Sequence, residues 1–133
     1  MKKLFILSIT TLAIAGSITS CKKEGAPSKS LDARTVKFKL YTDKDFSGDE
    51  HNITFSIFIK DGSTHLFDST YATMKIKDIP KAANAIITQK TIHASNNTLT
   101  VGFIYEIQGI GVSWHLDTLT AGQKSKVVDY NFQ

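Results

Sequence analysis

Apolar and polar residues alternate at every second position through most of residues 35–133. A two-residue period places the apolar side chains on one face of an extended chain, which is typical of β-strands buried on one side. The apolar members of these runs are Val36, Phe38 and Leu40; Ile53, Phe55, Ile57 and Ile59; Ala72, Met74 and Ile76; Leu99, Val101, Phe103, Tyr105 and Ile107; Val112, Trp114 and Leu116; and Val128, Tyr130 and Phe132. Such a chain buries its apolar side chains in sheets, because it has no long amphipathic helix from which to build a core.

Turn-forming residues separate these runs at Asp61-Gly62, Ser95-Asn96-Asn97, Gln108-Gly109 and Ala121-Gly122. Residues 84–92 add a weaker, β-branched strand, and only the segment near Pro80 fits a helical turn. We therefore expect residues 35–133 to form an all-β, antiparallel two-sheet sandwich of about seven or eight strands. The shape resembles immunoglobulin-like and transthyretin-like domains, a resemblance of fold that implies no function.

One face of the expected sandwich carries two aromatic residues. Asp61-Gly62 predicts a two-residue type I′ hairpin, whose register places Phe58 and Phe67 on one face. These two rings are either part of the core, which we favour, or an exposed apolar patch for a partner protein.

The strand around the single tryptophan has an apolar and a polar face. The alternation predicts that Val112, Trp114 and Leu116 point into the core, so the tryptophan is not expected to form a sugar platform. The opposite face is then polar and exposed.

Ser113, His115 and Asp117 make up that polar face. Alternate residues of a strand lie ~6.5 Å apart and point in parallel, whereas a Ser-His-Asp triad converges within ~3 Å contacts. The chain also lacks a Gly-x-Ser-x-Gly motif. We therefore expect no catalytic activity, and the alternative is a hydrolase that uses His115 and Asp117 with groups from other strands.

The first 20 residues have the pattern of a secretory signal peptide. Met1-Lys2-Lys3 is a short positive start, and residues 4–18 are uncharged and mostly apolar. This apolar stretch is shorter than the ~20 residues that a membrane-spanning helix needs.

Ile18-Thr19-Ser20-Cys21 follows and resembles the bacterial lipobox. The resemblance implies that Cys21, the only cysteine, is lipidated and becomes the first residue of the mature chain. Several acyl chains on one residue would anchor the protein stably in a membrane. Lys22 stands where an aspartate favours the inner membrane in enterobacterial lipoproteins, so the resemblance points to the outer membrane. Whether the domain faces the periplasm or the outside remains open.

Residues 21–34 then form a polar, flexible tether between the lipid and the domain at 35–133. Cleavage removes Lys2 and Lys3 from the 16 basic residues, which leaves 14 against 12 acidic residues. No dense basic patch with interleaved aromatic residues occurs, so we expect no nucleic-acid partner.

The segment 42–50 carries four carboxylates, on Asp43, Asp45, Asp49 and Glu50. Its start resembles an EF-hand calcium loop, but Thr54 stands where that loop has its bidentate glutamate. An ordinary turn between two strands and a weak calcium site formed by these carboxylates both remain open. We expect no other cofactor.

Two short sequences resemble acceptors of a bacterial O-glycosylation system, with Ser69 and Thr118 as the modified residues. Taken together, these features predict a lipid-anchored, non-catalytic binding or accessory module of the cell envelope. Its partner would be a protein, a glycan or another envelope component, and a structural subunit of a surface assembly is a further alternative.

Overall fold

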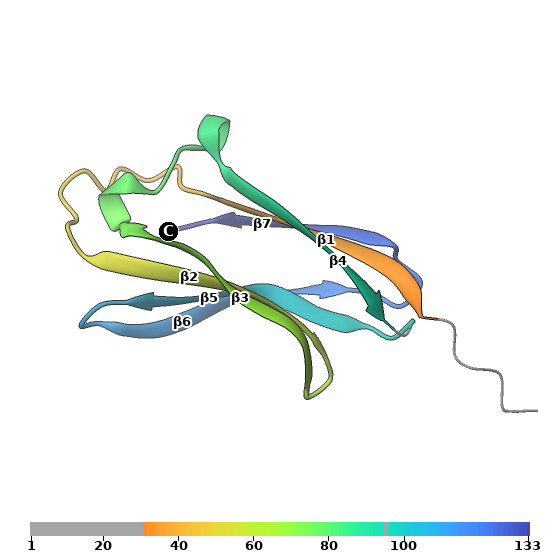
Figure 1. Ribbon diagram of the computed structural model, residues 1–133. Coiled ribbons are helices and arrows are strands. Elements are labelled where there is room, and N and C mark those ends of the chain that lie inside the picture. The colour runs from red at the N-terminus through yellow and green to blue at the C-terminus, as the bar shows by residue number, and fades with distance from the viewer. Residues whose placement is uncertain (1–30, 95) are drawn as a thin grey trace, which may run out of the picture.

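The computed structural model describes residues 31–94 and 96–133. The expected signal peptide, Cys21 and residues 22–30 of the tether lie outside these residues. The described chain is an all-β sandwich of seven strands, which confirms the predicted fold class (Figure 1). The strands are β1 (Asp32–Tyr41), β2 (Asn52–Asp61), β3 (Thr64–Lys75), β4 (Ile86–Ala94), β5 (Leu99–Ile107), β6 (Gly111–Leu119) and β7 (Ser125–Asn131).

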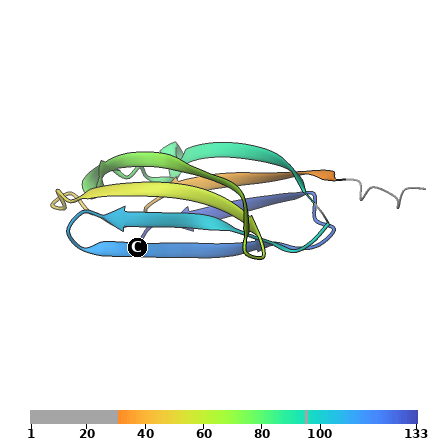
Figure 2. The same cartoon turned by 60° about the horizontal axis from the view of Figure 1, so that its bottom comes forward.

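The strands form a three-stranded sheet in the order β4-β1-β7 and a four-stranded sheet in the order β3-β2-β5-β6. Figure 2 shows them as two layers with the strands running along the length of the molecule. Every pair is antiparallel except β1 and β7, which run parallel from Thr35 beside Ser125 to Tyr41 beside Asn131. Lettered in chain order, the sheets are DAG and CBEF, which differs from the ABED and CFG sheets of immunoglobulin constant domains.

The core lies between the sheets and contains most of the apolar positions that the alternation assigned to it. Phe38 of β1 and Phe103 of β5 are fully buried, and their rings meet edge to face with centroids 5.6 Å apart. This pair joins the two layers, because the strands belong to different sheets. The fully buried aliphatic residues around it are Val36, Leu40, Ile53, Ile59, Leu99, Val101, Leu119 and Val128.

Two short 3-10 helices, η1 (Ile76–Asp78) and η2 (Ala82–Asn84), connect β3 to β4. The second lies in the segment near Pro80 where a helical turn was expected. Ile76 and Ile79 are buried and hold this connection against the core. The described residues contain no helix that is long and apolar enough to cross a membrane.

The first strand begins at Asp32, earlier than the domain boundary expected at residue 35. Arg34 causes the difference, because its side chain is only 1 % exposed and belongs to the packed end of the sandwich. Its guanidinium donates to the backbone carbonyls of Asn97 (2.5 Å), Thr120 (2.7 Å), Gln123 (3.1 Å) and Leu119 (3.2 Å).

The β2–β3 hairpin differs from the predicted one. Asp61 pairs with Thr64, so the two loop residues are Gly62 and Ser63, and only Gly62 has a positive φ, of 58°. A type I′ turn needs a positive φ at both positions, whereas glycine alone in the first position is the type II′ pattern. The predicted type I′ turn at Asp61-Gly62 is therefore wrong.

One of two register shifts in the same hairpin places Phe58 and Phe67 on different faces. Lys60 pairs with His65, but Ile59 pairs with Phe67, which leaves one extra residue in β3 between them. Phe67 is consequently partly buried against the core, while Phe58 lies on the outer face of the sheet. The prediction that the two rings share a face is wrong, because a one-residue slip reverses every following side chain.

The second shift introduces Tyr71 as an extra residue of β3, between the pairs that contain Thr70 and Ala72. Its hydroxyl donates to the carbonyl of Phe38, 3.3 Å away in the other sheet. Burial raises the pKa of Tyr71 to about 12. This bulge therefore directs a side chain of an edge strand across the gap between the sheets.

Candidate functional site

Strand β6 faces the opposite way from the prediction. Val112, Trp114 and Leu116 were expected in the core, but they are 58 %, 63 % and 55 % exposed on the outer face of the four-stranded sheet. The β5–β6 loop explains the difference, because Ile107 pairs with Gly111 and leaves three loop residues instead of the two that Gln108-Gly109 suggested. An odd loop length reverses the inward and outward positions of the following strand.

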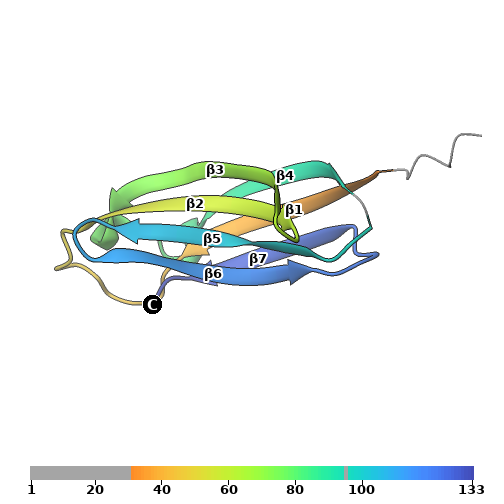
Figure 3. The ribbon, with the colours of Figure 1, turned by 90° about the horizontal axis from the view of Figure 1, so that it is seen from below.

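The outer face of β6 continues onto its neighbours β5 and β2, and Figure 3 looks onto these strands from that side. Ile104 is the cross-strand partner of Trp114, and it is 36 % exposed. We call the set formed by Phe58, Ile104, Val112, Trp114 and Leu116 the Trp114 face. Together with Lys60, these residues line a shallow depression of about 290 Å³.

Gly102 of β5 lies between two residues that line this depression. Its two cross-strand partners are Phe58 and Leu116, so the position without a side chain lies between two large apolar groups. Phe58 is only 4 % exposed, whereas Leu116 stands well out of the surface. A Cβ on Gly102 would lie 2.1 Å from the backbone oxygen of His115, which shows how closely β5 and β6 approach here.

The lining of the depression is apolar except for Lys60, whose ammonium group lies 5.4 Å from the centre of the Phe58 ring. Exposed tryptophan and aliphatic side chains gathered on one surface are typical of protein or membrane contact sites. The depression lies at the small end of the ~300–1,000 Å³ range of small-molecule sites. Its size suits a few apolar side chains of a partner.

The inner face of β6 carries Ser113, His115 and Asp117, which were expected to be exposed. His115 and Asp117 instead point toward β7 and are partly buried. The His115 ring stacks on Tyr130 with centroids 4.5 Å apart, and Lys126 binds the Asp117 carboxylate at 2.9 Å. The polar groups of this face are thus satisfied at the edge of the sandwich, where β6 and β7 meet.

These contacts also set the pKa values of two groups. Burial acts to raise the pKa of Asp117, but the hydrogen bonds from Lys126 and the Thr118 N–H outweigh it and hold that pKa below its usual value. Burial, and then the neighbouring Tyr105, raises the pKa of Tyr130 far above that of a free tyrosine. Both groups are consequently held in their ordinary charge state near neutral pH.

The hydrolase alternative needs His115 and Asp117 to converge on a nucleophile. His115 instead stacks its ring face on Tyr130, and Asp117 pairs with Lys126, so both side chains make these contacts toward β7. Ser113 shares their face through the regular β5–β6 register, and it is exposed.

The carboxylates of the acidic loop each have a separate partner. Asn131 donates to Asp43 at 2.8 Å, and the Ser47 backbone N–H donates to Asp45 at 3.0 Å. The bond from Ser47 keeps the pKa of Asp45 below its usual value. Loop and C-terminal strand are therefore joined by the Asp43–Asn131 pair.

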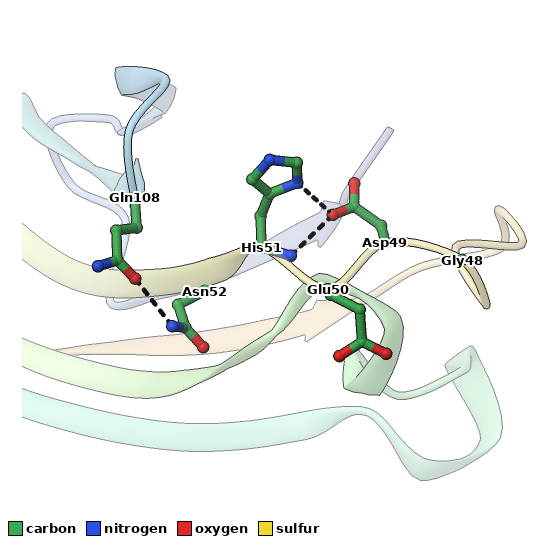
Figure 4. Close-up of a pocket in the computed structure, with 6 residues that line it drawn as sticks. All are labelled: Gly48, Asp49, Glu50, His51, Asn52 and Gln108. Atoms are coloured by element: carbon green, nitrogen blue, oxygen red, sulfur yellow. Dashed lines mark hydrogen bonds and ion pairs between the residues drawn. The ribbon is translucent and has the colours of Figure 1, made fainter.

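Asp49 and Glu50 point to opposite sides of the chain in Figure 4. The backbone N–H and Nδ1 of His51 both contact one oxygen of Asp49, at 3.0 and 2.7 Å. Glu50 pairs with Lys75 at 2.5 Å and also with Lys77, and these bonds lower its pKa to about 2.

The loop therefore does not gather its carboxylates around one point. No group of three or more His, Cys, Asp or Glu residues that could hold a metal occurs among residues 31–94 and 96–133. Calcium binding by Asp43, Asp45, Asp49 and Glu50 stays a prediction, and the loop has the contacts of a hydrogen-bonded turn. A depression beside it is lined by Gly48 to Asn52 and by Gln108, where the Asn52 amide donates to Gln108 at 2.8 Å (Figure 4).

The expected O-glycosylation residues Ser69 and Thr118 are exposed in the edge strands β3 and β6. The Ser69 hydroxyl donates to the Thr70 carbonyl at 3.2 Å. Neither position is closed to an enzyme, and both modifications stay predictions.

No family model, curated protein or solved structure matches this chain.

Proposed function

We propose that the protein is a non-catalytic binding module of the bacterial cell envelope that binds a protein partner through the Trp114 face. The observation that carries this proposal is the exposure of Trp114, at 63 %, among Val112 and Leu116 on a strand whose inner face is polar. Stability alone would favour the opposite arrangement, with the tryptophan in the core and His115 in solvent.

The chemistry of the surface favours protein over glycan as the partner. A sugar site needs polar side chains placed around its aromatic ring, whereas the immediate neighbours of Trp114 on strand and across strand are Val112, Leu116 and Ile104. Tryptophan in a partly apolar depression is the residue type that contributes most to protein interfaces. The depression is large enough for the side chains of one partner segment.

Attachment to the envelope rests on the lipobox, with Cys21 as the lipidated residue and the outer membrane as the destination. The described residues begin at residue 31, so nine residues, 22–30, separate them from Cys21. A fully extended chain spans ~3.3–3.6 Å per residue, which confines the domain to within ~40 Å of the lipid. The partner is then an envelope protein within that reach.

Photo-crosslinking in the cells that produce the protein tests the binding surface. A photoreactive amino acid replaces Leu116 in one strain and Val127 in another. Val127 is the matched control, since it is 51 % exposed on the outer face of the other sheet. We expect one crosslinked protein of defined mass at position 116 and none at position 127. The same set of products at both positions would contradict the proposal.

The anchor is tested separately with Cys21→Ser. We expect this variant to remain an uncleaved precursor and to acquire no radioactive palmitate. Unchanged labelling and unchanged membrane fractionation would show that Cys21 is not the attachment site.

A further inference from the structure

We propose that the free edge of β6 binds an extended segment of the partner as an additional strand of the four-stranded sheet, with its apolar side chains on the Trp114 face. This inference rests on the proposed function and specifies how the partner is bound. It follows from a comparison of the four edge strands in the described chain, which are β3, β4, β6 and β7.

An edge strand presents unpaired N–H and C=O groups, and proteins protect such edges with lysine, proline, bulges or inward-pointing charges. Strand β3 has two register shifts and ends in Lys75. Strand β4 contains Lys90, and β7 contains Lys126. Each of these three edges therefore carries at least one protective feature.

Strand β6 carries one of them, the inward-pointing charge of Asp117. Its sequence GVSWHLDTL has no lysine, arginine or proline, and it pairs with β5 from Leu99–Leu119 to Ile107–Gly111 without a register shift. Its one charged residue is Asp117, which is paired with Lys126. Among the described edge strands, β6 is thus the one that has neither a lysine nor a register shift, and it is the least protected against strand addition.

The edge is also held in place and limited in length. The contacts of His115 with Tyr130 and of Asp117 with Lys126 fix β6 against β7 before a partner arrives. The Asp117 carboxylate additionally accepts the Thr118 N–H at 2.7 Å, which occupies the edge near its C-terminal end. The open part therefore runs from Gly111 to about Leu116.

An added strand at this edge places every second side chain on the same face as Val112, Trp114 and Leu116. Backbone hydrogen bonds and apolar contacts would then come from one segment. The matching segment alternates apolar and polar residues, with its apolar side chains turned toward Val112, Trp114 and Leu116. These requirements define the partner as another protein that presents an extended segment whose central residues are uncharged.

The chain's only tryptophan lies in this site and reports on its occupancy. The probe is an acetylated nine-residue peptide of alternating valine and threonine with glutamate at each end. We expect it to shift the Trp114 emission to the blue and to protect the ring from acrylamide. The same peptide with every backbone nitrogen methylated keeps the side chains but cannot donate, and it should bind about tenfold more weakly or worse.

On the protein side, Ser113→Lys introduces the inward-pointing charge with which other edges are protected. Ser113 is exposed and lies outside the Trp114 face, so a folded variant is expected and is checked by circular dichroism. Ser125→Lys places the same charge at the exposed edge of β7 as the matched control. Binding should fall with Ser113→Lys and remain with Ser125→Lys.

Each other result overturns strand addition. Equal binding of the methylated peptide would show packing on the face alone, which leaves the proposed function standing. A concentration-dependent change in Trp114 emission and sedimentation without peptide would show that a second copy takes the edge. No emission change at millimolar peptide, or equal loss with both lysine variants, would show that β6 does not recruit strands.

Discussion

The imidazole ring of His115 stacks on the phenol ring of Tyr130, with centroids 4.5 Å apart and planes 15° from parallel. This contact joins the edge strand of one sheet to the edge strand of the other, because His115 belongs to β6 and Tyr130 to β7. The smaller, polar His115 of β6 therefore contributes to the packing of the two sheets, and the larger Trp114 does not.

His115→Ala should lower the free energy of unfolding by about 1 kcal/mol or more, because a stacked ring pair contributes ~0.5–1.5 kcal/mol beyond its buried area. Trp114→Ala should change it by no more than ~0.5 kcal/mol, as is usual for exposed residues. Urea unfolding followed by circular dichroism measures both variants. A larger loss with Trp114→Ala would mean that β6 faces the other way.

Gly102→Ala should destabilise the protein by about 1–3 kcal/mol, the range observed when atoms are forced into packed regions. The new methyl group would meet the His115 backbone oxygen, so β5 and β6 would have to separate. Gly48→Ala is the matched control, since a Cβ there meets nothing within 4 Å. Equal melting temperatures for the two variants would contradict the close approach of these strands.

Arg34→Met should cost at least about 2 kcal/mol, because it removes the donor for several inward-facing carbonyl groups. Besides the lower free energy of unfolding of the whole domain, we expect a local loss of stability, seen as faster amide hydrogen exchange at residues 96–98 and 120–124. Lys37→Met changes a cation on the solvent side of the same strand and should leave both measurements unaltered. Unchanged exchange in the Arg34 variant would show that other contacts hold these loops.

Glu50 should contribute to the acid sensitivity of the protein. Its pKa is lowered from 4.5 to about 2 by Lys75 and Lys77, so the folded state binds the proton less well than the unfolded state. The stabilisation is therefore present above about pH 4.5 and is lost as the pH falls toward about 2. In Glu50→Gln, urea midpoints should fall less steeply over this window. A parallel pH profile in variant and wild type would exclude the effect.

The acidic loop should not respond to calcium, because its carboxylates already accept separate hydrogen bonds. For each of the two proteins, the wild type and the Asp43→Ala/Asp45→Ala variant, the thermal melt with chelator should coincide with the melt of the same protein in millimolar calcium. A weak extracellular site would have a Kd of ~10⁻⁴–10⁻³ M. A rise of several degrees in the wild type alone would establish the calcium site that the sequence left open.

Much of the sandwich could be predicted because several strands show their buried face directly. In β1, the alternation of Val36, Phe38 and Leu40 with lysines matches the observed burial residue by residue. The inward positions of β2, β5 and β7 were also correct. The candidate site could not be predicted in this way, since the same two-residue pattern in β6 is compatible with either face.

The sequence by itself determined that residues from about 35 onward form an all-β sandwich, since a two-residue apolar period can be buried only in sheets. Only the tertiary structure decided which face of β6 is buried. A loop of three residues before Gly111 turned Trp114 outward, and Tyr130 and Lys126 of β7 supplied partners for His115 and Asp117. Because strand faces alternate at every residue, a single residue of loop length separates a core tryptophan from an exposed one, and contacts distant in sequence select between them.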